Sequence, residues 1–237
     1  MVYSFQPLGD NAIMIELGKD IHIQTQQKVQ FIASILDNHT KDWMIEYIPA
    51  FTTVTLFYDP FKIMRHAKKG ELPYNYVRSW LESFLTGVAV ENKITQRMIE
   101  IPVCYGGELG PDLEFVARHN NLSEDEVIQL HSAGDYLVYM IGFAPGFPYI
   151  GGMSEKIATP RKETPRLKIP PRSVGIAGKQ TGVYPIETPG GWQLIGRTPL
   201  ELFRPEKHPP TLLRPGDRIR FYPISYEEYL ELGGDKE

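Results

Sequence analysis

The stretch GFAPGFPYIGG at residues 142–152 decides the fold of this sequence, together with SVGIAGKQTGVYP at 173–185 and TPGGWQLIGR at 188–197. Residues 142–197 hold 10 of the chain's 21 glycines and 8 of its 20 prolines, interleaved with aromatic and β-branched residues. Those apolar residues argue against disorder. Because glycine allows φ > 0 and close backbone approach while proline fixes φ, the pattern predicts tight turns between short strands of a barrel or sandwich, around a cavity lined by backbone.

Length and charge narrow the class of protein. The chain has 237 residues, a net charge of -4 and one cysteine. This length fits one large domain or two small ones. The acidic balance gives no general attraction to nucleic acid or to an anionic membrane. One cysteine cannot form an internal disulfide and the first residues do not resemble a signal peptide, so we expect a cytoplasmic protein.

One uncharged run, residues 136–154, has enough length for a membrane span. Pro145, Pro148 and four glycines would break the helix that a bilayer requires. We therefore predict no transmembrane segment.

The first 104 residues alternate strand and helix patterns. Four β-rich runs lie at 12–17, 43–48, 53–58 and 97–104, and helical apolar spacing lies at 29–36 and 77–84. The order β-α-β-β-α-β is that of a ferredoxin-like half, although the last strand could instead open the following domain. Residues 91–93 resemble a linker, so we place an N-terminal α+β domain at 1–93 and a second domain at 94–237.

The second domain is predicted to be mainly β with few helices. Short helices are expected after Pro111 and at the capping boxes that begin with Ser123 and Ser225. Outside the glycine-rich segment, further strands are expected at 136–141, 200–203 and 218–222.

Two familiar glycine motifs are excluded by their details. Residues 173–181 resemble a phosphate-binding loop, but Ser173 replaces its first glycine, Gln180 stands where Ser or Thr would hold magnesium, and Pro185 prevents a following helix. At 142–146, proline occupies a place where a free amide would meet a pyrophosphate. A glycine-rich β-turn is the better interpretation of residues 173–181.

Histidine and cysteine give little support for metal or nucleophilic chemistry. The six histidines lack paired-ligand spacing, so no metal site is predicted for this chain alone. His131, just ahead of the strand at 136–141, is a candidate general base or hydrogen-bond donor, and a structural hydrogen bond at a helix end is the favoured alternative. Cys104 has no activating neighbour in sequence and is expected to be a small buried side chain.

Basic residues concentrate in the segment that leads to residue 173, where Glu163 is the one acidic residue among them: Arg161, Lys162, Arg166, Lys168 and Arg172. A positive field beside a glycine-lined pocket suits a carboxylate, a phosphate or an acidic partner. A solvated loop without function is an equally good interpretation of these charges.

The motifs at 142–149, 175–185 and 189–199 resemble the signature of the KipI / 5-oxoprolinase B-subunit family, also labelled allophanate hydrolase subunit 1. The resemblance covers nearly the whole chain. It implies a small N-terminal domain joined to a cyclophilin-like β-barrel domain. Many members have glycine where this chain has Arg172, which is expected to make the pocket entrance bulkier and more basic.

The resemblance also implies an activity. Members resemble one half of a carboxyltransferase-like pair and act with 5-oxoprolinase subunits A and C to open the lactam ring of 5-oxo-L-proline at the expense of ATP, giving L-glutamate. ATP is shared with the partner subunits, Mg²⁺ accompanies ATP, and the chain alone is expected to be inactive. Similar proteins inhibit the autophosphorylation of a sporulation sensor histidine kinase, and a partner that resembles the C subunit relieves this inhibition. Both roles remain open.

The motif residues receive roles from this resemblance. Lys179, Arg166 and Arg197 are expected to stabilise charge, with His131 as a further catalytic candidate. Gln180 and Ser173 are expected to orient the substrate. The walls of the pocket for substrate or nucleotide are expected to be three aromatic residues: Phe147, Tyr184 and Trp192.

Overall fold

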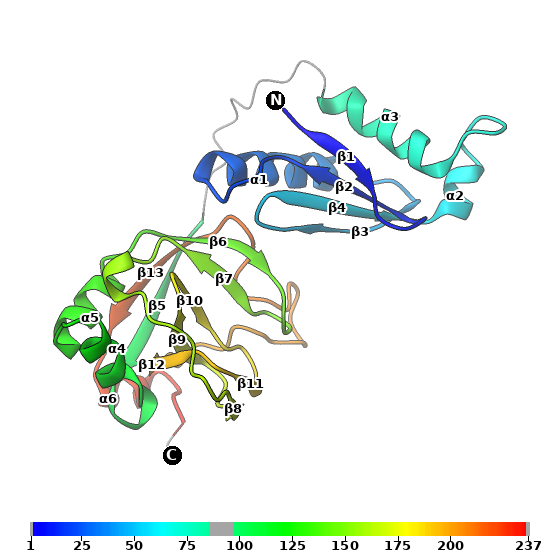
Figure 1. Ribbon diagram of the computed structural model, residues 1–237. Helices are drawn as coiled ribbons and strands as arrows, with labels where there is room; N and C mark the ends of the chain where they lie inside the picture. The colour runs from blue at the N-terminus through cyan, green and yellow to red at the C-terminus, as the bar shows by residue number, and fades with distance from the viewer. Residues whose placement is uncertain (1, 86–96, 236–237) are drawn as a thin grey trace. The chain divides into compact units, whose positions relative to one another are not determined.

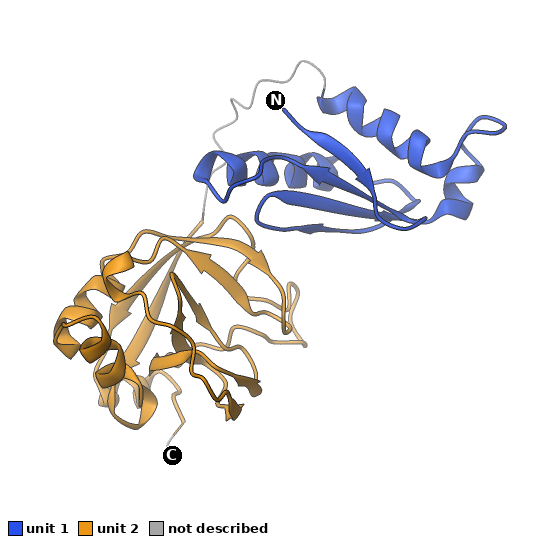
Figure 2. Ribbon diagram, in the orientation of Figure 1, with its two compact units in different colours: residues 1–95 blue, residues 96–237 orange. Residues whose placement is uncertain are grey.

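The computed structural model describes residues 2–85 and 97–235, and the chain divides into two compact units, Met1–Thr95 and Gln96–Glu237 (Figure 2). The expected domain boundary between residues 93 and 94 falls outside the described residues. Each unit has its own hydrophobic core. Among the helices that the structure describes, none is both long and apolar enough to cross a membrane.

The first unit contains an antiparallel four-stranded sheet in the order β1-β2-β4-β3 (Figure 1). Its strands are β1 (Ser4–Pro7), β2 (Ala12–Glu16), β3 (Met44–Pro49) and β4 (Thr53–Tyr58). Along β4, Val54, Leu56 and Tyr58 are buried while the residues between them are half-buried. This alternation is typical of a sheet that packs one face against helices.

Helices α1 (Ile23–Asn38), α2 (Pro60–Met64) and α3 (Pro73–Leu85) complete the first unit. Asp59 caps α2 by accepting the Phe61 and Lys62 amides, and Pro60 fits the first helical turn because no intrahelical partner awaits its missing N–H. The apolar sides of α1 and α3 share one core with the sheet, in which the Trp43 and Trp80 rings meet edge to face with centroids 5.3 Å apart.

The strand expected at 97–104 does not join the sheet of the first unit. It is β5 (Met98–Tyr105), which belongs to the second unit. The edge position beside β2 is taken by β1, which the sequence analysis missed because the short run SFQP lacks an alternating apolar pattern. The alternative that this strand opens the following domain is therefore confirmed, and the ferredoxin-like description of the first unit stays a prediction.

The second unit is built on a closed barrel of seven strands in the order β10-β7-β6-β13-β5-β12-β9. The strands after β5 are β6 (Tyr136–Ile141), β7 (Pro148–Gly151), β9 (Ser173–Ala177), β10 (Gln180–Val183), β12 (Gln193–Arg197) and β13 (Arg218–Pro223). β5 and β13 pair in parallel and the other neighbours are antiparallel. The glycine-rich segment therefore forms strands and turns of a barrel, as its composition predicted.

Short helices accompany the barrel: α4 (Leu113–His119), α5 (Glu124–Ser132) and α6 (Tyr226–Glu231), with 3₁₀ turns at Gly107–Leu109 and Glu155–Ile157. The capping boxes predicted at Ser123 and Ser225 are both present. The strand predicted at 200–203 is wrong, because only a single bridge between Phe203 and Thr211 forms there. That segment supplies too few backbone partners to extend a strand.

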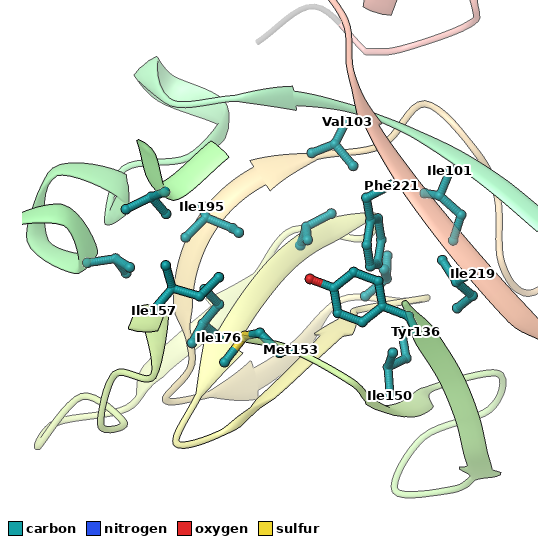
Figure 3. Packing of buried hydrophobic residues seen from close by; sticks show 14 of the residues in the cluster. Ile101, Val103, Tyr136, Ile150, Met153, Ile157, Ile176, Ile195, Ile219 and Phe221 are labelled. Atoms are coloured by element: carbon teal, nitrogen blue, oxygen red, sulfur yellow. The ribbon is translucent and has the colours of Figure 1, made fainter. Parts of the chain in front are cut away.

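The barrel interior is filled by aliphatic and aromatic side chains that include Ile101, Ile176, Ile195 and Phe221 (Figure 3). Every residue of β9 and β12 is buried. Strands buried on both faces need apolar neighbours on both, so another layer must cover the outside of these two strands. Cys104 is also buried, and burial raises the pKa of its thiol, as expected for a structural side chain.

His131 lies in the buried interior and is structural rather than a reachable base. Its Nδ1 lies 2.7 Å from the Tyr105 hydroxyl and its Nε2 lies 2.9 Å from Thr181 Oγ1. Because the Thr181 hydroxyl donates to the Gly175 carbonyl, we assign the proton to Nε2, which leaves Nδ1 to accept from Tyr105. Burial lowers the pKa of His131 to about 3, so the ring is neutral.

This burial predicts an acid sensitivity. Between pH 6.5 and about 3, His131 binds a proton in the unfolded chain but not in the folded one, so stability falls as pH falls. From pH 7.5 to pH 5 the loss is about 2 kcal/mol. In His131→Gln, the free energy of unfolding measured with urea should differ less between the two pH values, because the contribution of His131 is absent. His119→Gln, at an exposed helix end, should retain it, and equal pH dependence in all three proteins would contradict the assignment.

Candidate functional site

Two pockets flank a two-stranded ribbon beside the barrel, formed by β8 (Arg166–Ile169) and β11 (Thr188–Gly190) (Figure 1). Gly190 pairs with Arg166 across the ribbon. Pro189 and Gly190 of β11 line one pocket, whereas Arg166 and Lys168 of β8 line the other. The ribbon thus contributes to both pockets, which we name the aromatic pocket and the cationic pocket.

The aromatic pocket has a volume of about 350 Å³. Its lining is Phe143, Phe147, Tyr149, Arg161, Pro165, Tyr184, Pro189, Gly190, Gly191 and Trp192. Phe147 meets Tyr184 and Trp192 edge to face, with ring centroids 5.4 and 5.6 Å away. These buried rings form the layer that covers the outside of the barrel strands, with Ile169, Ala177 and Leu194.

Glycine backbone lies directly beneath these rings. A Cβ at Gly182 would approach Trp192 to 2.9 Å and Phe147 to 3.2 Å, and a Cβ at Gly190 would lie 2.5 Å from the Tyr184 hydroxyl oxygen. Real Cβ atoms essentially never come closer than 3.0 Å to another heavy atom. Gly182 and Gly190 are therefore required by the close approach of the rings to the backbone.

Burial sets the chemistry of the aromatic pocket. It raises the pKa of Tyr184 to about 12, although Arg161, the Trp192 backbone and Arg166 act in the opposite direction. The phenol is therefore neutral near pH 7. Arg161 is the one ionisable cation in the lining, so this pocket suits an apolar ring that carries an anionic group.

The cationic pocket is smaller, about 130 Å³. Its lining is Glu108, Leu109, Pro111, Arg166, Lys168, Pro170, Ser173, Leu194 and Arg197. Three cations against one carboxylate give it a positive field, which suits a carboxylate or a phosphoryl group. Arg197 Nε donates to the Pro171 carbonyl at 3.1 Å, and the Ser173 hydroxyl donates to the Pro170 carbonyl at 2.8 Å.

The position of Arg166 is fixed by an ion pair with Asp112. This buried carboxylate accepts from Arg166 at 2.8 Å, from Lys162 Nζ at 3.1 Å and from the Leu194 amide at 2.7 Å. Burial alone would raise the pKa of Asp112, but these hydrogen bonds and charges outweigh burial and lower it. Two cations share one carboxylate, so the cluster keeps a net positive charge beside the pocket.

Six of the residues expected from the sequence meet at these pockets. Phe147, Tyr184 and Trp192 lie together in the aromatic pocket, and Arg166, Ser173 and Arg197 lie together in the cationic pocket. The basic residues of the segment 161–172 are distributed over both pockets, since Arg161 lines the aromatic pocket and Lys168 lines the cationic pocket.

The other three expected residues line neither pocket. Lys179 follows Gly178 in the turn between β9 and β10, with its side chain 70% exposed and its Nζ 2.6 Å from Glu155. Gln180 begins β10 opposite Ala177. His131 is buried in the barrel. This turn confirms the prediction of a glycine-rich β-turn at 173–181, since Gly178 has φ of 58°.

Arg172 also differs from its expected place at the pocket entrance. Its side chain is buried and pairs with Asp235, so its charge is compensated within the chain. Its φ is 71°, in the left-handed region that glycine adopts most easily. Glycine, which the resemblance leads us to expect at this position in many members, would adopt this conformation without strain.

Asp112 and Lys168 belong to the candidate site but received no role from the sequence, although Lys168 was counted in the basic segment. Asp112 lies at the start of the helix expected after Pro111 and does precede α4, but its side chain caps no helix and instead reaches Leu194, 82 residues further on. No local pattern predicts such a contact. Lys168 could have been found, because the alternation Arg166-Leu167-Lys168 within a strand places both cations on one face.

Metal ligation finds no support in the part of the chain that the structure describes, where no group of three or more His, Cys, Asp or Glu side chains could hold an ion. The two pockets instead offer cations, hydroxyls and aromatic faces. Such a lining can bind an organic anion and stabilise negative charge that develops on it.

Asp112→Asn tests the support of the cationic pocket. We expect a loss of about 1–3 kcal/mol in the free energy of unfolding at pH 7, because two cations lose their carboxylate. Since the pKa of Asp112 is lowered on folding, its contribution exists above the usual carboxyl pKa of 3.8 and is lost as pH falls through the lowered value. Urea unfolding from pH 7 downward should therefore show the two proteins converging.

Asp135→Asn is the matched control, because this exposed carboxylate forms a surface ion pair with Arg218. It should change stability by less than about 1 kcal/mol. Equal effects of the two substitutions would contradict a supporting role for Asp112.

Comparisons with known proteins agree with this architecture. Residues 3–213 match the family described as carboxyltransferase domain, subdomain C and D. The B subunit of 5-oxoprolinase from Bacillus subtilis (strain 168) is 53% identical over 228 residues, which cover 96% of this chain and 95% of the relative. The B subunit of 5-oxoprolinase from Escherichia coli O157:H7 is 44% identical over 218 residues, which cover 91% and 94%.

Two solved structures extend the similarity. The conserved uncharacterized protein PH0987 from Pyrococcus horikoshii is 45% identical with a TM-score of 0.55, over 95% of this chain and 100% of that chain. TTHA0988 is 33% identical with a TM-score of 0.77, over 90% of this chain but 40% of that longer chain. The chain therefore belongs to the KipI / 5-oxoprolinase B-subunit family, a family of carboxyltransferase subdomains C and D, as its motifs predicted.

Proposed function

We propose that this chain is the B subunit of an ATP-dependent 5-oxoprolinase, which opens 5-oxo-L-proline to L-glutamate together with subunits A and C. The observation that carries the proposal is the placement of an aromatic pocket and a cationic pocket on one ribbon. A substrate with an apolar ring, reacting through an anionic intermediate, needs both kinds of surface. The names of the relatives support the same reaction.

The aromatic pocket takes the lactam ring in this proposal. Phe147, Tyr184 and Trp192 offer apolar faces to the ring carbons, and Arg161 offers a cation to the carboxylate. The neutral Tyr184 phenol sits deep beside Gly190, where it can hydrogen-bond a polar ring atom but cannot act as a base near pH 7.

The cationic pocket takes a phosphoryl group. A volume of about 130 Å³ is below the roughly 300 Å³ at which pockets begin to enclose a whole small molecule, so this pocket does not hold the nucleoside of ATP, which we assign to the partner subunits. When bound, ATP supplies the phosphoryl group that makes the lactam carbon a good electrophile. Mg²⁺ would arrive with ATP, since the described residues offer it no ligand cluster.

The residues of this chain would then bind the reacting groups and stabilise their charge. Arg166, fixed by Asp112, and Lys168 stabilise the negative charge of the phosphoryl group while it passes to the lactam oxygen and ADP leaves. Ser173 and Arg197 also line that pocket. Because Asp112 fixes Arg166 before substrate arrives, the stabilising charge needs little reorganisation.

Partner subunits complete this picture. TTHA0988 matches this chain over 40% of its own length, so a relative exists in which a longer polypeptide contains the same module. On this proposal, the module described here acts by binding subunits A and C. Cytoplasmic location, inactivity of the isolated chain, and the cyclophilin-like and ferredoxin-like descriptions of the two units stand as parts of this proposal.

Inhibition of a sporulation sensor histidine kinase is the alternative role, and it rests on the sequence resemblance. It requires a docking surface and no catalytic pocket. Substitutions in the cationic pocket therefore separate the two roles. They should lower turnover of 5-oxoproline but leave the inhibition of kinase autophosphorylation unchanged.

Two exposed lysines give a matched test. Lys168 and Lys179 each pair with a glutamate, Glu187 or Glu155, but only Lys168 lines the cationic pocket. In the assembly with subunits A and C, Lys168→Ala should lower 5-oxoproline-dependent ATP hydrolysis by roughly 10- to 100-fold, since one stabilising charge is lost. Lys179→Ala should stay near the parent rate, with both variants equally stable to heat.

A loss of turnover in Lys179→Ala with a normal rate in Lys168→Ala would support the catalytic role that the sequence assigned to Lys179. It would also contradict the role proposed here for Lys168. Absence of turnover in the parent assembly would refute the enzyme proposal. Kinase autophosphorylation is measured in the presence of the parent chain, Lys168→Ala and Lys179→Ala. Inhibition by the parent chain would support the alternative role.

A further inference from the structure

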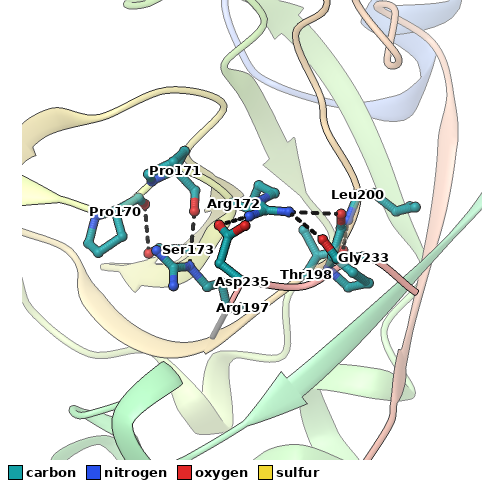
Figure 4. A network of polar contacts seen from close by, with 10 residues as sticks. Pro170, Pro171, Arg172, Ser173, Arg197, Thr198, Leu200, Gly233 and Asp235 are labelled. Carbon is teal, nitrogen blue, oxygen red and sulfur yellow. Dashed lines mark hydrogen bonds and ion pairs between the residues drawn. The ribbon is translucent and has the colours of Figure 1, made fainter. Parts of the chain in front are cut away.

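We infer that Arg172 is a positioning residue that couples the C-terminal segment of the chain to both pockets. The assignment rests on the proposed function only for its effect on turnover. Its structural part stands on contacts within the second unit (Figure 4). The sequence placed Arg172 in a basic segment and at the pocket entrance, and neither expectation gave it a supporting role.

The backbone of Arg172 joins the two pockets. Its amide donates to the Tyr184 carbonyl at 2.5 Å, and its carbonyl accepts from the Thr198 amide at 3.0 Å. Tyr184 is a wall of the aromatic pocket, and Thr198 directly follows Arg197 of the cationic pocket. A displacement at residue 172 therefore reaches both linings through one peptide unit on each side.

The side chain of Arg172 binds the C-terminal segment. Its guanidinium donates to the Pro199 and Gly233 carbonyls at 3.2 Å each and forms an ion pair with Asp235 (Figure 4). The arginine side chain is 9% exposed, whereas the Asp235 side chain is 61% exposed. One end of this contact is therefore buried beside the pockets, and the other is accessible at the surface.

Physical reasons make this contact necessary rather than incidental. A buried cation is unfavourable without a charged partner, and Asp235 is the carboxylate that the structure pairs with it. A non-glycine residue at φ of 71° is also unfavourable and needs contacts that compensate it. Without Asp235, both effects favour movement of Arg172 out of its site.

Trp192 offers a direct readout of the aromatic pocket. Its ring lies among Phe147 and Tyr184, whose ring currents make the resonance of a fluorinated indole sensitive to small displacements. The other two tryptophans, Trp43 and Trp80, lie in the first unit and serve as internal references. Incorporation of 5-fluorotryptophan into the full chain gives one ¹⁹F signal for each of these tryptophans, and Trp192→Phe identifies the relevant one.

Two substitutions break the contact from opposite ends. Asp235→Ala leaves Arg172 in its left-handed conformation without a charge partner. Arg172→Gly removes the side chain but suits φ of 71°, so it separates the loss of the contact from a loss of folding. Asp235→Glu, which keeps the carboxylate, should restore the parent behaviour. Glu155→Ala removes an exposed carboxylate elsewhere in the same unit and is the control.

We expect Asp235→Ala and Arg172→Gly to shift or broaden the Trp192 signal, with Trp43 and Trp80 unchanged and Glu155→Ala like the parent. In the assembled enzyme the same two variants should raise KM for 5-oxoproline by about 2- to 30-fold, with a smaller change in kcat. An unchanged Trp192 signal in both variants overturns the positioning role.

The two proposals fail separately. A Trp192 response in the isolated chain together with no turnover in the parent assembly would sustain the positioning role and refute the enzyme function. Normal turnover with an unchanged Trp192 signal would support the enzyme function and refute the positioning role.

Discussion

The approach of aromatic rings to bare backbone is the constraint on which the second unit depends. Strands β9 and β12 are buried on both faces, so the barrel needs an outer apolar layer as well as an inner core. Phe147, Tyr184 and Trp192 supply that layer, and they fit because Gly182 and Gly190 carry no Cβ. The same packing leaves the aromatic pocket at its edge. Stability and the candidate site therefore come from one arrangement, and a side chain placed at either glycine would disturb both.

Carboxylates far away in sequence fix the cations near the pockets: Asp112 fixes Arg166, and Asp235 fixes Arg172. The two pairs differ in consequence. Asp112 is shared with Lys162, so positive charge remains available to a ligand, whereas the charge of Arg172 is compensated within the chain. The basic segment at 161–172 thus contains residues for binding and residues for support, which composition alone could not separate.

Local signals in the sequence predicted local structure well. The capping boxes at Ser123 and Ser225, the turn at Gly178 and the barrel strands of the glycine-rich segment all follow from short-range sterics and hydrogen bonding. The errors share another origin. The edge strand β1 and the contact of Asp112 with Leu194 depend on which strands become neighbours in space. A structural role was the favoured interpretation of His131, but its complete burial depends on the same long-range arrangement. Lys179 was chosen for its motif, and the motif specifies a turn rather than a pocket.

The arrangement of cations also bears on which ring compound the aromatic pocket would accept. Proline and 5-oxoproline share ring size and carboxylate, but proline carries a protonated secondary amine where the lactam has a neutral amide. Arg161 lines the pocket, and both Arg161 and Arg166 act on Tyr184 through their charges. A ligand ammonium in that field would be repelled and would lose its hydration, whereas a neutral amide loses less. On the proposed function, positive charge around an apolar pocket therefore binds the carboxylate and disfavours proline, which has the same ring size and carboxylate but carries an ammonium group.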